Sequence, residues 1–312
     1  VSLTAEVATN YVDLRTAQGR FGLTEASLKS LEETYNLTLF KFKAGLGDEL
    51  AVQQARYNLE STRSQLPTLR TSIAEAKNRL SILLGEQPGS LDKRLNATAP
   101  IPACPASVAV GIPADILRQR PDVRQAERQL ASQTAQIGVA TAELYPKLKL
   151  SGSIGLQALT LGGLFNNSNG TSSGSAGLSW RVFDAGAIRR NIEIQTALQE
   201  QYLQAYEAAV LTAMEEAENA IGAYAQEQQK RRSLAEAVKA AETAAELAQI
   251  KYRAGLSDFA TVLETERSLL TYRDQLLQSE GTIVSNLIKL YKALGGGWQA
   301  DASQSGKRGD IQ

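Results

Sequence analysis

The sequence predicts a mainly α-helical protein with one β-hairpin, in which long helices pack antiparallel as coiled coils. Three observations support this fold class. Apolar residues recur every three or four positions over most of the 312 residues. Aromatic residues make up 6% of the chain, so alanine and leucine must supply most of the burial, which favours close-packed helices. Residues 147–184 alternate instead with a period of two, which is typical of β-strands.

The composition excludes several classes of chemistry. The chain has no histidine and a single cysteine, Cys104, which removes histidine-based catalytic triads, histidine-ligated metal sites, CxxC redox motifs and intrachain disulfides. The 33 basic and 33 acidic residues cancel, so no net field attracts nucleic acid. No run of roughly 18 apolar residues is present, so we expect no transmembrane helix. We therefore expect a protein that is not an enzyme, uses no cofactor or metal and binds no nucleic acid.

An internal repeat organises the chain. Aligned at an offset of 210 residues without a gap, residues 1–86 and 211–296 share 19 identical positions, ten of them within residues 41–66. The segment KFKAGLGDEL at Lys41–Leu50 falls on KYRAGLSDFA at Lys251–Ala260. A duplicated helical hairpin explains this agreement, and two unrelated alanine-rich helices are the alternative.

The duplication also implies a missing counterpart. The second copy follows residues 87–210, whereas the first begins at Val1, already in helical periodicity and without a capping residue. By the logic of the repeat, we expect a counterpart of about residues 121–210 upstream of Val1. That segment would supply a further helix, a further β-hairpin and an export signal.

The first repeat, residues 1–86, is predicted to form a helical hairpin. Two helices, 1–43 and 48–84, are joined by the turn at Ala44–Gly47. Pro67 should bend the second helix, because proline removes a helical hydrogen bond and its ring clashes with the preceding turn.

A proline-rich connector, residues 87–120, follows this hairpin. It holds five of the eight prolines, so we expect an extended segment. Pro121 and Asp122 then suit the first turn of a helix over 121–146, because proline needs no amide partner there and aspartate complements the helix dipole. The side chains expected to pair with one another along this helix are Arg118, Arg120, Asp122, Arg124 and Arg128.

Residues 147–184 are predicted to form a β-hairpin. In KLKLSGSIGLQ, from Lys147, and SAGLSWRVF, from Ser175, apolar and polar positions alternate on either side of a loop rich in glycine, asparagine and serine. Runs of roughly nine to eleven residues fit membrane-spanning strands with Trp180 in an aromatic belt, while alternation alone fits a soluble amphipathic hairpin equally well. The residues predicted to share the lipid-facing side are Leu148, Leu150, Ile154, Leu156, Leu178, Trp180 and Val182.

The second repeat lies within residues 185–296 and is predicted to form a longer helical hairpin. No proline follows Asp184, and apolar residues step by three and four positions, as in a coiled-coil seam. A helix over residues 187–253 would be roughly 100 Å long. It must pack lengthwise against other long helices, including those of neighbouring chains. Residues 297–312 are predicted to form a disordered tail.

Several segments carry a family resemblance. LRQRPDVRQAE at Leu117–Glu127, IG at Ile137–Gly138 and YP at Tyr145–Pro146 are followed by WRVFDAG at Trp180–Gly186 and YRAGL at Tyr252–Leu256. Together these segments resemble the outer-membrane efflux channels of the TolC superfamily. They are most similar to its lipoprotein branch, often called NodT- or OprM-like, which is paired with resistance-nodulation-division pumps. The resemblance covers nearly the whole chain.

The resemblance implies an architecture, a location and partners. It implies a homotrimer whose long helices form a periplasmic α-barrel and whose strands contribute to a β-barrel in the outer membrane of a Gram-negative bacterium. It implies a passive exit duct, with a periplasmic adaptor and an inner-membrane resistance-nodulation-division pump as partners and outer-membrane lipid around the strands. A duct for type I protein secretion is the alternative within the superfamily, and a soluble coiled-coil scaffold is the alternative from another class.

The resemblance suggests a docking site at the two duplicated turns. It implies that Gly45, Leu46, Gly255 and Leu256 contact the adaptor. The other interpretation is that they are plain helix turns, in which glycine supplies a positive φ and leucine packs the tip.

A gate is implied at Glu264. Relatives often carry an acidic residue at this position that points into the periplasmic aperture, where threefold symmetry would gather three carboxylates that select cations and couple closure to pH. Two departures weaken the analogy. Gln54 occupies the matching position of the first repeat, and Ala260 stands where relatives carry a bulkier apolar gate residue. A solvated surface glutamate is the alternative.

Cys104, in the segment IPAC, resembles the end of a lipoprotein signal. It lacks the apolar stretch that precedes such a cysteine, so we expect no lipidation there. The resemblance implies instead that the acylated cysteine of a palmitate-bearing lipoprotein would precede Val1.

Overall fold

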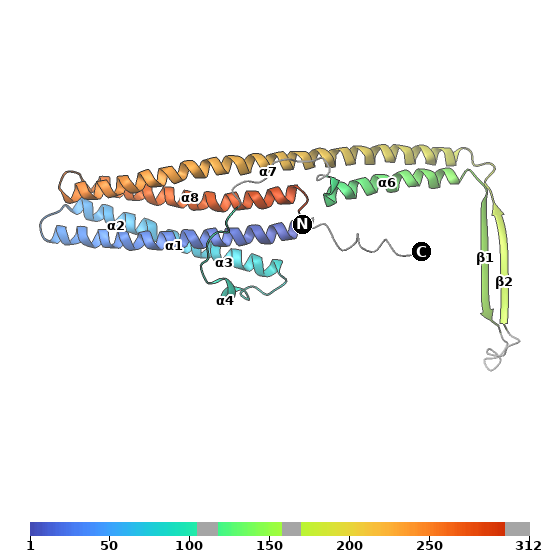
Figure 1. Cartoon of the computed structure of the whole chain (residues 1–312). Coiled ribbons are helices and arrows are strands. Elements are labelled where there is room, and N and C mark those ends of the chain that lie inside the picture. The colour runs from blue at the N-terminus through green and yellow to red at the C-terminus, as the bar shows by residue number, and fades with distance from the viewer. Residues whose placement is uncertain (105–117, 158–169, 297–312) are drawn as a thin grey trace, which may run out of the picture. The chain divides into compact units, whose positions relative to one another are not determined.

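The computed structural model describes residues 1–104, 118–157 and 170–296, which form long helices and one pair of strands (Figure 1). The predicted fold class is confirmed, since this part of the chain is mainly helical with one antiparallel β-hairpin. Within these ranges, no helix combines the length and the apolar character needed to cross a membrane. The predicted disordered tail lies outside the described residues.

The chain divides into two compact units. The first combines Val1–Leu117 with Met214–Gln312, and the second is Arg118–Ala213. One helix, α7 (Ala187–Arg253), contributes residues to both units. The first unit holds the two duplicated helix turns, and the second holds the β-hairpin.

The first hairpin is built from α1 (Ser2–Lys43), α2 (Glu49–Arg63) and α3 (Gln65–Leu83). α1 packs against both α2 and α3, which run back along it (Figure 1). The second predicted helix is interrupted at Ser64 rather than at Pro67 itself. Pro67 lies in the first turn of α3, where its missing amide hydrogen removes no helical hydrogen bond. A helix continuous through Ser64 would instead press the proline ring against the carbonyl of Arg63.

The second hairpin consists of α7 and α8 (Phe259–Ala293). α7 runs for 67 residues without interruption, as the absence of proline predicts. The predicted coiled-coil seam is buried in part, and the small side chains of its alanines let neighbouring helices approach closely. The buried residues of this seam are Ala213, Ala217, Ala220, Tyr224, Val238, Ala241 and Ala248.

The two hairpins carry an equivalent ion pair at positions that correspond in the internal repeat. Glu32 pairs with Arg63 at 2.8 Å in the first, and Glu242 pairs with Arg273 at 2.6 Å in the second. Both partners lie 210 residues further along the chain in the second pair. Each hairpin therefore carries the same bridge between its two helices.

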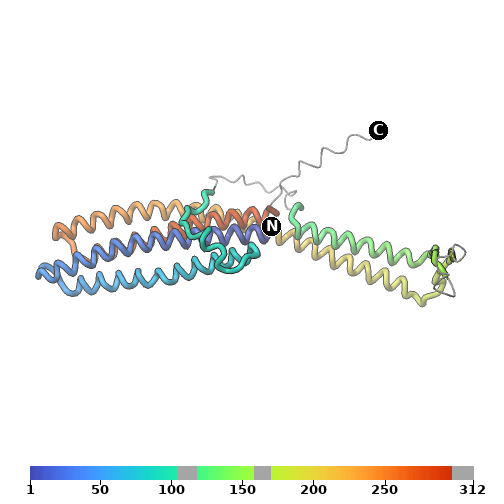
Figure 2. The backbone as a smooth tube through the Cα atoms, turned by 90° about the horizontal axis from the view of Figure 1, so that it is seen from below, coloured from blue at the N-terminus to red at the C-terminus, as the bar shows by residue number. Residues whose placement is uncertain are grey.

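The hairpins meet along α1 and α8, and this contact is called the inter-hairpin interface below (Figure 2). At Gly281 the helices lie so close that a β-carbon there would stand 2.2 Å from Oγ1 of Thr16. Further along, Arg20 donates two hydrogen bonds to Asp274, at 2.6 and 3.1 Å. Backbone proximity and a two-point ion pair thus hold this part of the interface.

The described part of the connector is anchored rather than simply extended. It contains a short helix, α4 (Asp92–Leu95), and Leu91 is buried in an apolar cluster on α1 and α3. The buried guanidinium of Arg15 donates to the carbonyl oxygen of Ala97 at 2.7 Å. These contacts correct the expectation of a purely extended segment, because Leu91 and its neighbours find apolar and charged partners on the helices. Residues 105–117 lie outside the described part.

The second unit begins with α6 (Pro121–Ala142), whose first turn holds Pro121 and Asp122 as predicted. Of the arginines expected to form pairs here, the structure joins Arg120 to both carboxylate oxygens of Asp122, at 3.1 and 2.7 Å. This hydrogen bonding from Arg120 lowers the pKa of Asp122. The helix ends at Ala142, earlier than predicted, and the residues after it form tighter turns up to Pro146, which has no amide hydrogen to donate to Ala142.

The β-hairpin pairs β1 (Lys147–Leu156) with β2 (Gly170–Ser179) over ten residues each. Leu148 lies opposite Leu178, so apolar side chains share one face. On the other face the hydroxyls of Ser151 and Ser175 lie 2.7 Å apart. The predicted two-faced hairpin is therefore present, and its strands are exposed throughout.

The second strand is shifted relative to its prediction. β2 begins at Gly170, five residues before Ser175, because β1 offers ten paired positions and Thr171 and Ser173 continue the polar alternation. It ends at Ser179, so Trp180 and Val182 lie beyond it and the prediction that they belong to the strand is wrong. The indole nitrogen of Trp180 instead donates to the carbonyl oxygen of Leu144, at 3.0 Å.

Candidate functional site

The two duplicated turns have the same backbone geometry. In the first, the amide of Gly45 donates to the carbonyl of Phe42 and that of Leu46 to Lys41, both at 2.9 Å. In the second, Gly255 donates to Tyr252 at 3.1 Å and Leu256 to Lys251 at 2.9 Å. The pairs form Schellman motifs, which require a left-handed residue, and the φ angles of Gly45 and Gly255 are +72° and +71°. These two turns are called the tips below.

Each tip is closed by the cap of the following helix. The carboxylate of Asp48 accepts a hydrogen bond from the amide of Leu50, and that of Asp258 accepts one from the amide of Thr261. The bonds from Thr261 lower the pKa of Asp258, so the cap stays ionised at neutral pH. Schellman motif and cap together hold each tip in one conformation.

The tips project leucine into solvent. Leu46 is 79% exposed and Leu256 is 78% exposed, which is unusual for a large apolar side chain held in a defined turn. The alternative interpretation, in which leucine packs the tip, does not describe these two exposed side chains. Two rigid turns with equal, unused apolar side chains suit contact with a partner.

Further exposed apolar residues precede each tip, and the sequence analysis missed them. Leu37 and Phe40 are exposed on α1, and their counterparts 210 residues later, Leu247 and Ile250, are exposed on α7. Their three-residue spacing places each pair on one helix face. The identity of Leu37 with Leu247 in the repeat alignment was the signal that could have revealed this surface.

The predicted gate residues lie on the outward face of α8. Ala260 and Glu264 are exposed and line a hollow of about 430 Å³ together with Gln54 of α2. Glu264 and its counterpart Gln54 are thus brought to one surface of the chain. Among the described residues Glu264 forms no ion pair, so its carboxylate is available to solvent and to ions.

The opposite face of α8 closes the core beneath the tips. Its side chains join residues of α2 and α7 in an apolar cluster that consists of Ala55, Ala248, Phe259, Val262 and Leu263. The ammonium group of Lys41 lies 4.4 Å from the ring centre of Tyr252, which adds a cation–π contact between the two hairpins. The hairpins are therefore joined at the level of the tips.

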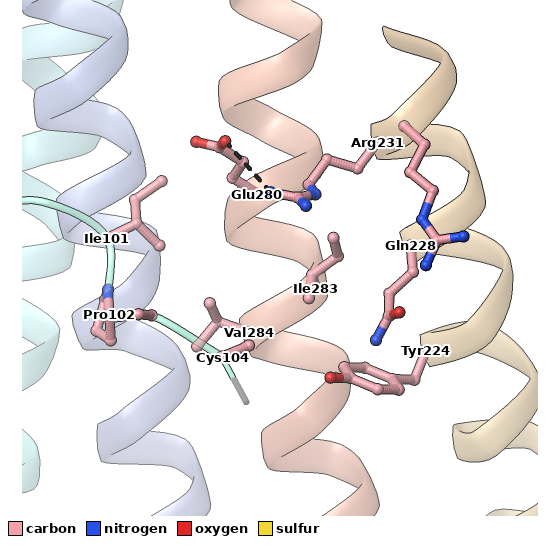
Figure 3. Close-up of a pocket in the computed structure, with 11 residues that line it drawn as sticks. Ile101, Pro102, Cys104, Tyr224, Gln228, Arg231, Glu280, Ile283 and Val284 are labelled. Carbon is pink, nitrogen blue, oxygen red and sulfur yellow. Dashed lines mark ion pairs between the residues drawn. The ribbon is translucent and has the colours of Figure 1, made fainter. Parts of the chain in front are cut away.

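Cys104 lies in a groove between the connector and the second hairpin (Figure 3). The groove has a volume of about 360 Å³, and an ion pair of 4.0 Å between Arg231 and Glu280 crosses it. Cys104 packs against the cluster around Tyr224 and Ile283, and burial raises the pKa of its thiol although Arg231 opposes the shift. Cys104 is therefore a partly buried free thiol.

No group of three or more histidine, cysteine, aspartate or glutamate side chains that could hold a metal ion is present in the described ranges. The chemistry available at the tips and at Glu264 is contact and charge rather than bond making.

The chain belongs to the outer membrane efflux protein family, whose profile matches residues 1–86 and 112–296. It is 36% identical over 291 residues to nodulation protein T of Rhizobium leguminosarum bv. trifolii, covering 93% of this chain and 61% of that protein. It is 30% identical over 313 residues to the probable efflux pump outer membrane protein TtgC of Pseudomonas putida, covering 100% of this chain and 64% of that protein.

Solved structures agree with this assignment. The outer-membrane channel OprN superimposes with a TM-score of 0.85 at 36% identity, covering 96% of this chain and 67% of that one. The open-state MtrE outer membrane channel of Neisseria gonorrhoeae superimposes with a TM-score of 0.75 at 29% identity, covering 95% and 66%. The resemblance found in the sequence is confirmed. The chain spans less than two thirds of the length of the curated relatives it matches.

Proposed function

We propose that this protein is the outer-membrane exit duct of a tripartite efflux system, through which small molecules leave the cell passively. The observation that carries the proposal is that the family profile matches both helical repeats and the β-hairpin, and not the helices alone. Energy for transport comes from an inner-membrane pump, and the duct itself catalyses no reaction.

The exposed face of the β-hairpin supports a membrane location over a soluble scaffold. Leu150 is 75% exposed and Ile154 is 93% exposed on the same face of β1. A soluble protein would leave this apolar row in water, whereas lipid covers it at no such cost.

The β-hairpin also supports assembly. A two-stranded sheet has two unpaired outer edges, and a bilayer offers no partner for their backbone groups. Further strands must therefore close the sheet within the membrane. We propose that they come from a homotrimer, as in the architecture that the sequence resembles.

The tips are the proposed contact with a periplasmic adaptor. The Schellman motifs and helix caps hold the backbone of the tips in one conformation, so a partner that covers Leu46 and Leu256 gains apolar burial at low entropic cost. Glu264 and Ala260 are the proposed gate, where copies of the chain bring carboxylates together around the aperture.

The proposal is tested by conductance and export. The protein reconstituted in planar bilayers should open ion-conducting channels, and its expression should restore drug export to a Gram-negative strain that lacks its own outer-membrane duct. A protein that stays monodisperse without detergent and never conducts would contradict the proposal.

A further inference from the structure

The inter-hairpin interface is closed by direct contacts at two levels along α8, and between these levels it contains two hollows. At the first level, Arg20 donates two hydrogen bonds to Asp274. At the second level, Phe259 belongs to the apolar cluster beneath the tips. Glu266 lies between these levels on α8. Its surroundings decide how tightly the two hairpins pack in the middle of the interface.

Two hollows flank Glu266. One has a volume of about 440 Å³ and lies between α1, α2, α3 and α8, and the other has about 570 Å³ and lies between α1, α7 and α8. Ser27, Leu31 and Leu270 line both hollows together with Glu266. A water molecule occupies about 30 Å³ of liquid volume, so both hollows have room for several.

The carboxylate of Glu266 is incompletely satisfied. Its Oε2 atom is buried and has no hydrogen-bond partner. Burial raises the pKa of this carboxyl, because the charged form loses more solvation than the neutral form. A neutral carboxylic acid avoids most of this penalty, whereas an ionised one needs water or a cation.

The charged groups that face the hollows do not remove this penalty. From α8, Arg273 is paired with Glu242 of α7 and Asp274 is paired with Arg20 of α1. Other lining groups from α1, α2 and α3 are hydroxyls, amides and apolar side chains, with no titratable side chain among them. The remaining charged side chains that line the hollows are Glu246 of α7 and Arg267 of α8.

We propose that Glu266 is a proton-controlled packing switch in the inter-hairpin interface. In its neutral form it allows α1 and α8 to pack as described, and in its ionised form it draws water into both hollows and loosens α8 from α1. This inference goes beyond the exit-duct function and does not depend on it, because it concerns the packing of the chain itself.

The sign of the pH dependence follows from linkage. A carboxyl whose pKa is higher in the folded than in the unfolded chain favours the packed form at low pH, where it is protonated in both states. The packed form loses this relative advantage as pH rises through the raised pKa. The middle of the interface should therefore loosen towards neutral and alkaline pH, while the levels of Asp274 and Phe259 stay closed.

The acid proposed as the switch is present in the second repeat and has no acidic counterpart in the first. The counterpart of Glu266 in the first repeat is Arg56, which is exposed on α2. The charged position at this level is therefore partly buried in the second hairpin and exposed in the first. Loosening should move α8, which holds the partly buried acid, away from its neighbour α1.

The test follows the accessibility of Ser27, which lines both hollows. Ser27→Cys is introduced into a Cys104→Ser background, and its labelling rate by a small neutral thiol reagent is measured on the protein in detergent from about pH 5 to pH 8. The rate is divided at each pH by that of Ser72→Cys, an exposed site on α3, to remove the intrinsic ionisation of the thiol. We expect this ratio to rise several-fold with pH.

The deciding variant is Glu266→Gln, which keeps the shape of the side chain and removes the charge. It should hold the ratio constant across the pH range, and Glu266→Leu, which replaces the acid with an apolar group of similar size, should do the same. Glu246→Gln removes an exposed acid from the same surroundings and should keep the rise. A flat ratio in the parent, or a rise that persists in both Glu266 variants, overturns the proposal.

Discussion

At Gly281 the absence of a side chain lets α8 lie directly against Thr16 of α1. An alanine in a helix is normally favoured over glycine by about 0.5–1 kcal/mol. Here the added methyl would overlap Oγ1 of Thr16 and stand 3.2 Å from its Cβ and Cγ2, so the threonine or the helix must shift. We expect Gly281→Ala to lower the free energy of unfolding by about 1–3 kcal/mol, measured as a shift of the urea midpoint by circular dichroism.

A matched glycine in α1 provides the control. A β-carbon at Gly22 would meet nothing within 4 Å, so Gly22→Ala should be neutral or stabilising. Adding Thr16→Ala to Gly281→Ala should recover most of the loss, because the overlapping group is removed. If Gly281→Ala and Gly22→Ala shift the midpoint alike, the close approach is not what limits this site.

At Glu264 the prediction concerns ions rather than stability. If copies of this carboxylate converge at the aperture, Glu264→Gln should reduce cation selectivity and remove block by multivalent cations from the periplasmic side. Single-channel recording in planar bilayers measures both. The fold should be unaffected, because the amide keeps the shape of the side chain and the site is exposed.

Gln54 lines the same hollow as Glu264, so replacing it with glutamate adds a charge where Glu264→Gln removes one. Gln54→Glu doubles the number of acids that each chain presents and should strengthen cation block. Unchanged selectivity and block in both variants would return Glu264 to the role of a solvated surface residue.

Candidate functional residues on the surface could be predicted from the sequence more readily than those inside the protein. Glu264 was found through a family resemblance, and its exposure agrees with a role towards solvent. Glu266 was missed although it follows the buried Val262 by four positions, which places an acid on the apolar side of α8. Such a pattern reveals an unusual burial only when the neighbouring helix is known, because a hollow is a property of two surfaces.

Among the elements, the β-hairpin makes the clearest prediction. Leu150 and Ile154 occupy the apolar face of β1, and Ser151 and Ser153 the polar face. Leu150→Lys or Ile154→Lys should cost about 2–4 kcal/mol near the middle of a bilayer, whereas Ser151→Lys and Ser153→Lys should be tolerated. The fraction of folded protein recovered in outer membranes measures the difference. Equal tolerance on the two faces would exclude a lipid-facing hairpin.

Helices and strands could be predicted to different accuracy. Pro67 predicted an interruption of the second helix, and the lack of proline after Asp184 predicted that α7 would be long and continuous. The position of β2 could not be read from alternation, because glycine and serine occupy both of its faces. Its register is decided by pairing with β1, which placed Trp180 beyond the strand.

At the scale of the whole molecule, the prediction concerns drug export and its dependence on the two tips. A protein with Leu46→Asp and Leu256→Asp should still assemble in the outer membrane but fail to support drug export, because a charge replaces the apolar group offered to the adaptor. Drug accumulation in cells and crosslinking to the adaptor measure the loss. Each single variant should retain part of the activity, since the other tip has the same geometry.

The control replaces another exposed apolar residue. Ile82 lies near the end of α3 and is 58% exposed, so Ile82→Asp adds the same charge away from the tips. It should leave export intact. Export at the normal level in the double tip variant would rule the tips out as the docking site.

The arrangement of the hairpins was the part of the fold that the sequence left open. The repeat predicted two similar units, and the helical periods predicted their lengths. The contact of α1 with α8 depends on Gly281 and on the Arg20–Asp274 pair, neither of which has an identical counterpart in the other repeat. Asymmetric contacts of this kind do not show in an alignment of the chain with itself.

The pairing of α1 with α8 sets an order of events during synthesis. Arg20 and Asp274 are 254 residues apart, so α1 is complete long before its partner exists. At about 5–20 residues per second, the ribosome needs about 13–50 s to produce the intervening chain. During that time the side of α1 that α8 will cover is open to water and to other chains. Such long-range closure is slow and prone to aggregation, so a holding chaperone should raise the yield of this protein more than that of a helical protein with local contacts.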